Sequence, residues 1–109
     1  MKRGEIWTVA GGNGYAGKPR PAVIVQDDRF SENASVTLCT FTTDETEAPL
    51  FRLVIAPSPM NGLNTVSRLM VDKITTVSRG KLGQRVGHLD DADMVRLNRA
   101  MMVFLGLAG

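Results

Sequence analysis

The chain has 109 residues, of which 43% are hydrophobic and 22% are charged, a composition typical of one ordinary globular domain. We expect residues 1–109 to form that single domain around one core. A domain of this size buries a modest fraction of its surface and is only marginally stable alone, which favours association into a dimer. The formal net charge of +2 permits an acidic partner but does not by itself indicate a nucleic-acid-binding protein.

Cysteine content and the N-terminal residues narrow the class of protein further. A single cysteine, Cys39, can form neither an internal disulfide nor a zinc site. The first seven residues carry charges where a signal peptide needs an apolar core, and no apolar run reaches the roughly 18 residues of a membrane span. We therefore expect a cytoplasmic protein without membrane association.

Two strands are predicted near the N-terminus, on either side of a glycine-rich segment. Residues 5–9 are rich in β-branched and aromatic side chains, and residues 22–25 form an unbroken apolar run typical of a strand buried on both faces. Four glycines between residues 10 and 17 predict a mobile loop. That loop joins the two strands.

Further strands are predicted at residues 35–42, 51–55, 67–76 and 84–87, each bounded by Gly, Pro or polar residues. Most of the six strands follow one another without an intervening helix, which favours an antiparallel, strongly bent sheet or a small barrel. The last segment differs: its apolar residues recur at helical spacing, and Asp90 is a good N-cap. A C-terminal amphipathic helix is predicted over 91–107, with Leu89 and Met94 as its hydrophobic staple.

Arg20 is the first candidate for chemistry. It stands between Pro19 and Pro21, which hold its backbone extended, and it follows the glycine-rich segment. A guanidinium group held in this way can bind a phosphate with two hydrogen bonds, although a salt bridge at the sheet edge is the alternative. A nucleotide-binding P-loop is excluded, because Lys18 is followed by proline and a strand instead of Ser or Thr and a helix.

Other polar residues have ordinary structural explanations as well as chemical ones. Thr42 is favoured in any strand, and Asp72 with Lys73 can be an exposed pair. His88 is the single histidine, so a two-histidine ribonuclease mechanism is impossible, and no spacing of His, Cys, Asp and Glu predicts a metal site. Basic residues in predicted loops and strand ends are candidates to line one groove: Lys18, Arg20, Arg68, Lys73, Arg79, Lys81 and Arg85.

Three blocks of sequence together resemble the MazF/PemK toxins: residues 3–7 (RGEIW), 18–25 (KPRPAVIV), and 71–77 (VDKITTV) followed by 81–83 (KLG). The resemblance covers nearly the whole chain. It implies a mainly β fold with a C-terminal helix, an SH3-like small barrel of the MazF/PemK/CcdB toxin type. It also implies a homodimer, a cognate antitoxin that lies across the active groove, and cleavage of single-stranded RNA without metal or cofactor.

By the same resemblance, Arg20 and Thr42 match the family's catalytic arginine and threonine, and Asp72 matches the aspartate of one branch. That branch has an arginine two residues earlier, where this chain has Met70. Arg68, on the same strand face, is a partial substitute. We expect Arg20 to bind the scissile phosphate, Thr42 to orient it, and Asp72 to be a candidate acceptor for the 2′ proton.

The predicted RNA-binding residues surround this site: Gly14, Tyr15, Lys18, Arg68, Lys73, Arg79 and Lys81. Tyr15 can stack on a base, and a single strand is required because a duplex hinders in-line attack by the 2′-oxygen. Two alternatives without nuclease activity remain at this stage. One is a toxin of the same fold that binds a protein, as CcdB-type gyrase inhibitors do, and the other is a non-toxic SH3-like interaction module.

Overall fold

The computed structural model describes residues 1–10 and 18–108, which form seven strands, one α-helix and three short 3-10 helices. The strands are β1 (Glu5–Val9), β2 (Arg20–Ile24), β3 (Ser35–Thr42), β4 (Arg52–Ile55), β5 (Ser67–Met70), β6 (Thr75–Ser78) and β7 (Leu82–His88). The helices are η1 (Asp28–Phe30), η2 (Val71–Lys73), η3 (Arg79–Lys81) and α1 (Asp91–Phe104). No helix in these residues is both long enough and apolar enough to cross a membrane.

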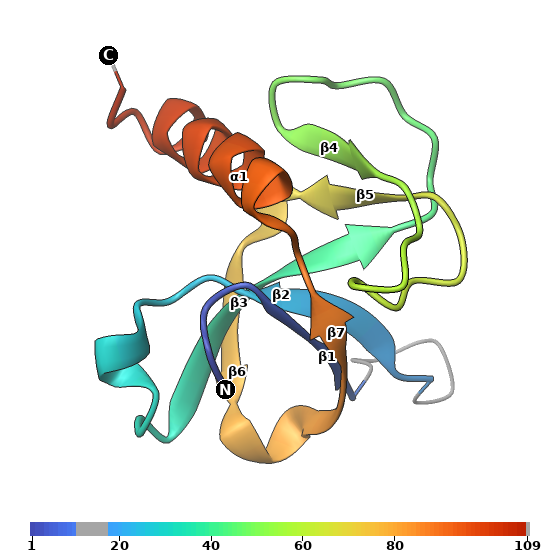
Figure 1. Cartoon of the computed structure of the whole chain (residues 1–109). Coiled ribbons are helices and arrows are strands. Elements are labelled where there is room, and N and C mark those ends of the chain that lie inside the picture. Colours follow the sequence, from blue (N-terminus) through green and yellow to red (C-terminus); the bar gives the residue numbers. More distant parts are fainter. Residues whose placement is uncertain (11–17, 109) are drawn as a thin grey trace.

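All strand pairs are antiparallel, and the sheet follows the order β4-β5-β3-β2-β1-β7, with β6 also paired to β3 (Figure 1). The eight-residue β3 organises this sheet, because its first half pairs with β6 and its last two residues pair with β5. The predicted fold class, mainly β with a C-terminal helix, is confirmed. Within the described residues β4 and β7 stand at opposite ends of the sheet, so the expected small barrel is open.

The prediction of one continuous strand over residues 67–76 is wrong. The chain forms β5 and then β6, with the 3-10 helix η2 between them. η2 redirects the backbone from the C-terminal end of β3 toward its N-terminal half, and Val71 anchors the turn because its side chain is fully buried and its N–H donates to the Phe51 carbonyl (2.9 Å). Local pattern did not reveal this change of partner, because residues 67–76 contain no Gly or Pro that would mark a break in the strand.

One principal hydrophobic core lies between the bent sheet and α1. Leu97 and Ala100 of α1 are buried in it together with residues from β1, β2, β3, β4 and β5. α1 packs against β4 and η2 (Figure 1), and the rings of Phe51 and Phe104 lie 5.9 Å apart. A smaller cluster of Val9, Ala22 and Leu38 fills the opposite face of the sheet.

The ends of α1 follow helix-capping chemistry. The Asp90 carboxylate accepts from the Asp93 N–H (2.7 Å), which confirms the predicted N-cap. The helix ends at Phe104, three residues before the predicted Leu107, because Gly106 adopts a left-handed conformation (φ +76°). The N–H of Leu107 then donates back to the Met102 carbonyl (2.7 Å), which closes the helix end.

Candidate active site

The pairing of β2 with β3 brings Arg20 and Thr42 to the same end of the sheet. β2 begins at Arg20 and β3 ends at Thr42, and Ala22 is paired with Thr40 in the antiparallel register. Arg20 precedes Ala22 by two residues and Thr42 follows Thr40 by two, so both stand beyond the same pair. Two residues that are 22 positions apart in the chain are thereby brought to the same end of neighbouring strands.

Arg20 borders two hollows in the surface. The first is a cleft of about 380 Å³, lined by both polar and apolar residues, between the start of β2 and the segment that connects β4 to β5. It is lined by Lys18, Pro19, Arg20, Pro21, Thr43, Leu63, Asn64, Thr65 and Ser67. We call it the Arg20 cleft.

The second hollow, of about 230 Å³, is mainly apolar and lies over β2, β3 and β6. Val9, Leu38 and Val77 form its floor, and Lys81 joins Arg20 at its border. A phosphate on Arg20 would thus have space on both sides for the nucleotides that flank it. Of the predicted RNA-binding residues, the structure brings Lys18 and Lys81 to Arg20.

Arg68 lies beside Thr42, because the two residues are paired in the β3–β5 register. Its guanidinium group donates to the Asp44 carbonyl (3.4 Å) and to the Glu47 carboxylate (3.3 Å), both in the acidic segment after β3. The Thr42 hydroxyl accepts from the Asp44 N–H (3.1 Å). Thr42 and Arg68 therefore both contact the Asp44 backbone, and an anion that approaches Arg68 competes with the Glu47 carboxylate.

Asp72 lies in η2 and is bound by an arginine that the sequence analysis did not single out. Arg52 of β4 donates to both carboxylate oxygens, from Nε to Oδ1 (2.8 Å) and from Nη2 to Oδ2 (3.1 Å). These hydrogen bonds and the positive charge of Arg52 hold the pKa of Asp72 below its ordinary range. Arg52 is paired with Met70, the position at which one branch of the family has an arginine. In this chain, an arginine on the neighbouring strand therefore binds Asp72.

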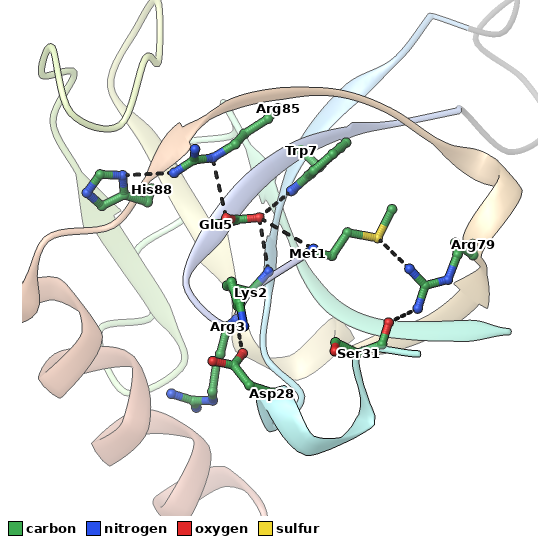
Figure 2. Close-up of polar contacts among 10 residues, drawn as sticks. All are labelled: Met1, Lys2, Arg3, Glu5, Trp7, Asp28, Ser31, Arg79, Arg85 and His88. Atoms are coloured by element: carbon green, nitrogen blue, oxygen red, sulfur yellow. Dashed lines mark hydrogen bonds and ion pairs between the residues drawn. The ribbon is translucent and has the colours of Figure 1, made fainter. Parts of the chain in front are cut away.

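Arg79 and Arg85 contact the N-terminal segment instead of the Arg20 cleft (Figure 2). Arg79 donates to the carbonyls of Ser31 and Asn33 and to the Met1 sulfur (3.5 Å). Arg85 forms an ion pair with Glu5 (3.6 Å) and lies 3.4 Å from Nδ1 of His88. The expectation that these basic residues line one groove with Arg20 is therefore not met for Arg79 and Arg85.

The remaining predicted RNA-binding residues are Lys73, Gly14 and Tyr15. Lys73 is exposed in η2 next to Asp72, and the RNA-binding predictions for Gly14 and Tyr15 fall outside the described residues. Burial and the neighbouring Asp72 charge raise the pKa of the Cys39 thiol to about 12, so this thiol is not a nucleophile at neutral pH. Among residues 1–10 and 18–108, no group of three or more His, Cys, Asp and Glu is arranged to hold a metal ion.

Comparison with known proteins places the chain in a family. Residues 2–105 match the PemK-like, MazF-like toxins of type II toxin-antitoxin systems. The chain belongs to this family. It is 58% identical over 109 residues to a probable endoribonuclease MazF of Mycolicibacterium smegmatis, a match that covers all of both chains. It is also 27% identical to the endoribonuclease EndoA of Bacillus subtilis, over 98% of this chain and 96% of that protein.

Solved structures of MazF-type toxins have the same fold. An endoribonuclease from a mycobacterial species, in complex with its cognate antitoxin, superposes with a TM-score of 0.79 at 27% identity, over 98% of this chain and 96% of that one. The match extends over β1 to α1, so the whole toxin fold is present. The resemblance drawn from the three sequence blocks is confirmed.

Proposed function

We propose that this MazF-type toxin is an endoribonuclease that cuts single-stranded RNA without a metal ion or cofactor. The observation that carries the proposal is the position of Arg20, beside the end of β3 and at the border of two hollows that can take the flanking nucleotides. The endoribonuclease names of the relatives in M. smegmatis and B. subtilis support the same reaction. Cleavage of cellular RNA would stop translation and growth.

The reaction uses the substrate's own nucleophile. The 2′-oxygen attacks the adjacent phosphorus, the bond from phosphorus to the 5′-oxygen breaks, and the products carry a 2′,3′-cyclic phosphate and a 5′-hydroxyl. Arg20 binds the scissile phosphate and stabilises the negative charge that develops on it, and a guanidinium group, which stays protonated in proteins, does not act as a base. The Thr42 hydroxyl orients the phosphate.

Asp72 remains a predicted acceptor for the 2′ proton. Both of its oxygens already accept hydrogen bonds from Arg52, and its low pKa makes it a weak base at neutral pH. Proton transfer to Asp72 would therefore require Arg52 to withdraw. In the geometry described here, Asp72 holds Arg52 in place through two hydrogen bonds.

The partners follow from the family and from the charges of the site. Type II systems pair a toxin with an antitoxin, and the mycobacterial neighbour was solved with its cognate one. Because Lys18, Arg20 and Lys81 give the two hollows a positive bias, an acidic and partly disordered antitoxin segment suits them, and its binding should weaken with salt. We also propose that the toxin works as a cytoplasmic homodimer.

The experiment that tests this function uses purified protein and a single-stranded RNA whose cut site has been mapped. Cleavage should continue in excess chelator, and a single deoxynucleotide immediately 5′ of the scissile phosphate should stop it while RNA binding survives. The folded Arg20→Ala variant is the inactive control. Arg20→Lys should also cleave RNA poorly, because lysine lacks the planar guanidinium group that binds a phosphate with two hydrogen bonds. Ends with a 5′-phosphate, or cutting at the deoxy position, would overturn the mechanism.

A further inference from the structure

The segment that connects β4 to β5 forms one wall of the Arg20 cleft, and an internal hydrogen-bond frame holds it in shape. Asn61 is 4% exposed, and its side-chain oxygen accepts from the N–H groups of Ser58 and Leu63 (both 3.0 Å). Its side-chain amide donates to the Ala56 carbonyl (2.9 Å), and the Ser58 hydroxyl accepts from the Asn61 N–H (3.1 Å). Buried groups satisfied in this way fix the backbone.

Two glycines dock this segment against β7. Gly62 has a left-handed backbone (φ +68°), and a Cβ built there would lie 2.3 Å from the Val86 carbonyl oxygen. A Cβ on Gly87 would lie 2.4 Å from the Met60 carbonyl oxygen, which itself accepts from the His88 N–H (3.0 Å). At the other end, the Ser67 hydroxyl donates to the Thr65 carbonyl (3.0 Å). Residues 56–67 are thus a preformed wall.

This wall presents two polar side chains to the cleft. Asn64 and Thr65 are exposed and line the cleft opposite Arg20 and Lys18. Within the described residues the Asn64 amide makes no hydrogen bond to the protein, in contrast to the amide of Asn61, whose oxygen and nitrogen are both engaged. A rigid loop that displays an uncommitted amide beside a phosphate-binding arginine is suited to read a base edge.

We propose that Asn64 determines the sequence specificity of cleavage, by reading the base of one nucleotide next to the phosphate held by Arg20. The inference rests on the proposed function. A carboxamide offers one acceptor and two donors, which match the adjacent acceptor and amino group of adenine in a bidentate pair. Bases in single-stranded RNA expose those edges. Adenine carries this pattern on two edges, N7 with the N6 amino group and N1 with the same amino group, and its pairing with asparagine is the recurrent one. We therefore expect Asn64 to select adenine, with Thr65 as a second polar contact in the same cleft.

The experiment maps cut sites in a pool of random single-stranded RNA, by sequencing the ends made by the wild type and by three variants. The wild type should show adenine at one position beside the cut. Asn64→Ala should lower the preference for that adenine about tenfold, since a bidentate pair contributes about 1–3 kcal/mol of discrimination. Asn64→Asp offers acceptors alone and should shift the preference toward cytosine, whose amino group donates.

Asn98→Ala is the matched control. Asn98 is an exposed asparagine on α1 that accepts from Arg3 (2.7 Å), away from the cleft, and its loss should leave the cut motif unchanged. Circular dichroism should show the same fold for all variants, because Asn64 and Asn98 are both exposed.

Three results would overturn the inference while leaving the nuclease intact: a wild-type motif without adenine beside the cut, an unchanged motif in Asn64→Ala, or an equal loss of cleavage at every sequence. A wild-type protein that cuts no RNA would instead overturn the proposed function, and this inference with it.

Discussion

Three arginines of this chain differ in what surrounds them. Arg52 forms a bidentate ion pair with Asp72, Arg79 is held by backbone carbonyls, and Arg20 borders the two hollows at the start of β2. Residue type alone does not separate these roles, since every arginine side chain carries the same planar, positively charged guanidinium group. The surroundings decide which arginine stabilises the fold and which can meet a substrate.

The Arg52–Asp72 pair predicts how stability depends on pH. The folded-state pKa of Asp72 lies below its ordinary value of 3.8, so the pair stabilises the fold above that value and the stabilisation is lost as pH falls through the folded-state pKa. Asp72→Asn should lower the free energy of unfolding by about 1–2 kcal/mol at pH 7, because Arg52 then lacks its charged partner.

Urea unfolding of the wild type and of Asp72→Asn, followed from pH 7 to pH 3, measures this difference. The gap between the two proteins should narrow as the pH falls below 3.8 toward the folded-state pKa of Asp72. Glu45→Gln, in the exposed segment after β3, is the control and should show little change at any pH. Equal urea midpoints for wild type and Asp72→Asn at pH 7 would contradict the role given to the pair.

At the scale of elements, β3 and the segment before β5 decide the shape of the site. β3 pairs with β2, β5 and β6 along its length, which places its last residue beside the first residue of β2. The wall formed by residues 56–67 then closes the cleft from the opposite side. The wall approaches the backbone of β7 so closely that glycine is required where the two meet.

Gly87→Ala should destabilise the protein by about 1–3 kcal/mol, because the new methyl group has no room between β7 and the Met60 carbonyl oxygen. Gly80→Ala is the matched control: a Cβ there meets no atom within 4 Å, so the substitution should be neutral or slightly stabilising. The urea midpoint measures both effects. A Gly87→Ala protein as stable as Gly80→Ala would show that the wall is not docked tightly on β7.

The whole molecule leaves apolar side chains exposed at the end of α1. Met102, Val103, Phe104, Leu105 and Leu107 are each 46–71% exposed, in a chain of 11.8 kDa whose own core is small. Met102, Leu105 and Leu107 line one hollow together, and contiguous apolar surface is typical of association sites. The size argument and the family resemblance both favour a dimer.

Sedimentation equilibrium in dilute buffer should therefore give twice the chain mass of 11.8 kDa. The mass should be nearly independent of added salt, because burial of apolar surface is not screened as charge pairs are. A mass of one chain over the whole concentration range would exclude the homodimer.

Much of this protein could be predicted from its sequence because the relevant signals are local. The pattern of apolar residues predicted most strands, and Asp90 predicted the N-terminus of the helix. The block around Arg20 was one of the three that carried the family resemblance. A proline restricts the backbone of the residue before it, and a capping carboxylate binds N–H groups in the first turn of its own helix. Both effects extend over only a few residues of the chain. These features need no knowledge of which strand lies next to which.

Strand pairing and side-chain partners were decided by the tertiary structure alone. The exchange of β3 partners split residues 67–76 into two strands, and the β4–β5 register brought Arg52 opposite Met70 and within reach of Asp72. Only the tertiary structure shows that Asn64 lines the Arg20 cleft, because hydrogen bonds centred on Asn61 hold the segment that carries it. Each of these joins residues far apart in the chain, and such contacts depend on the register and packing of the whole sheet, which periodicity and composition do not encode.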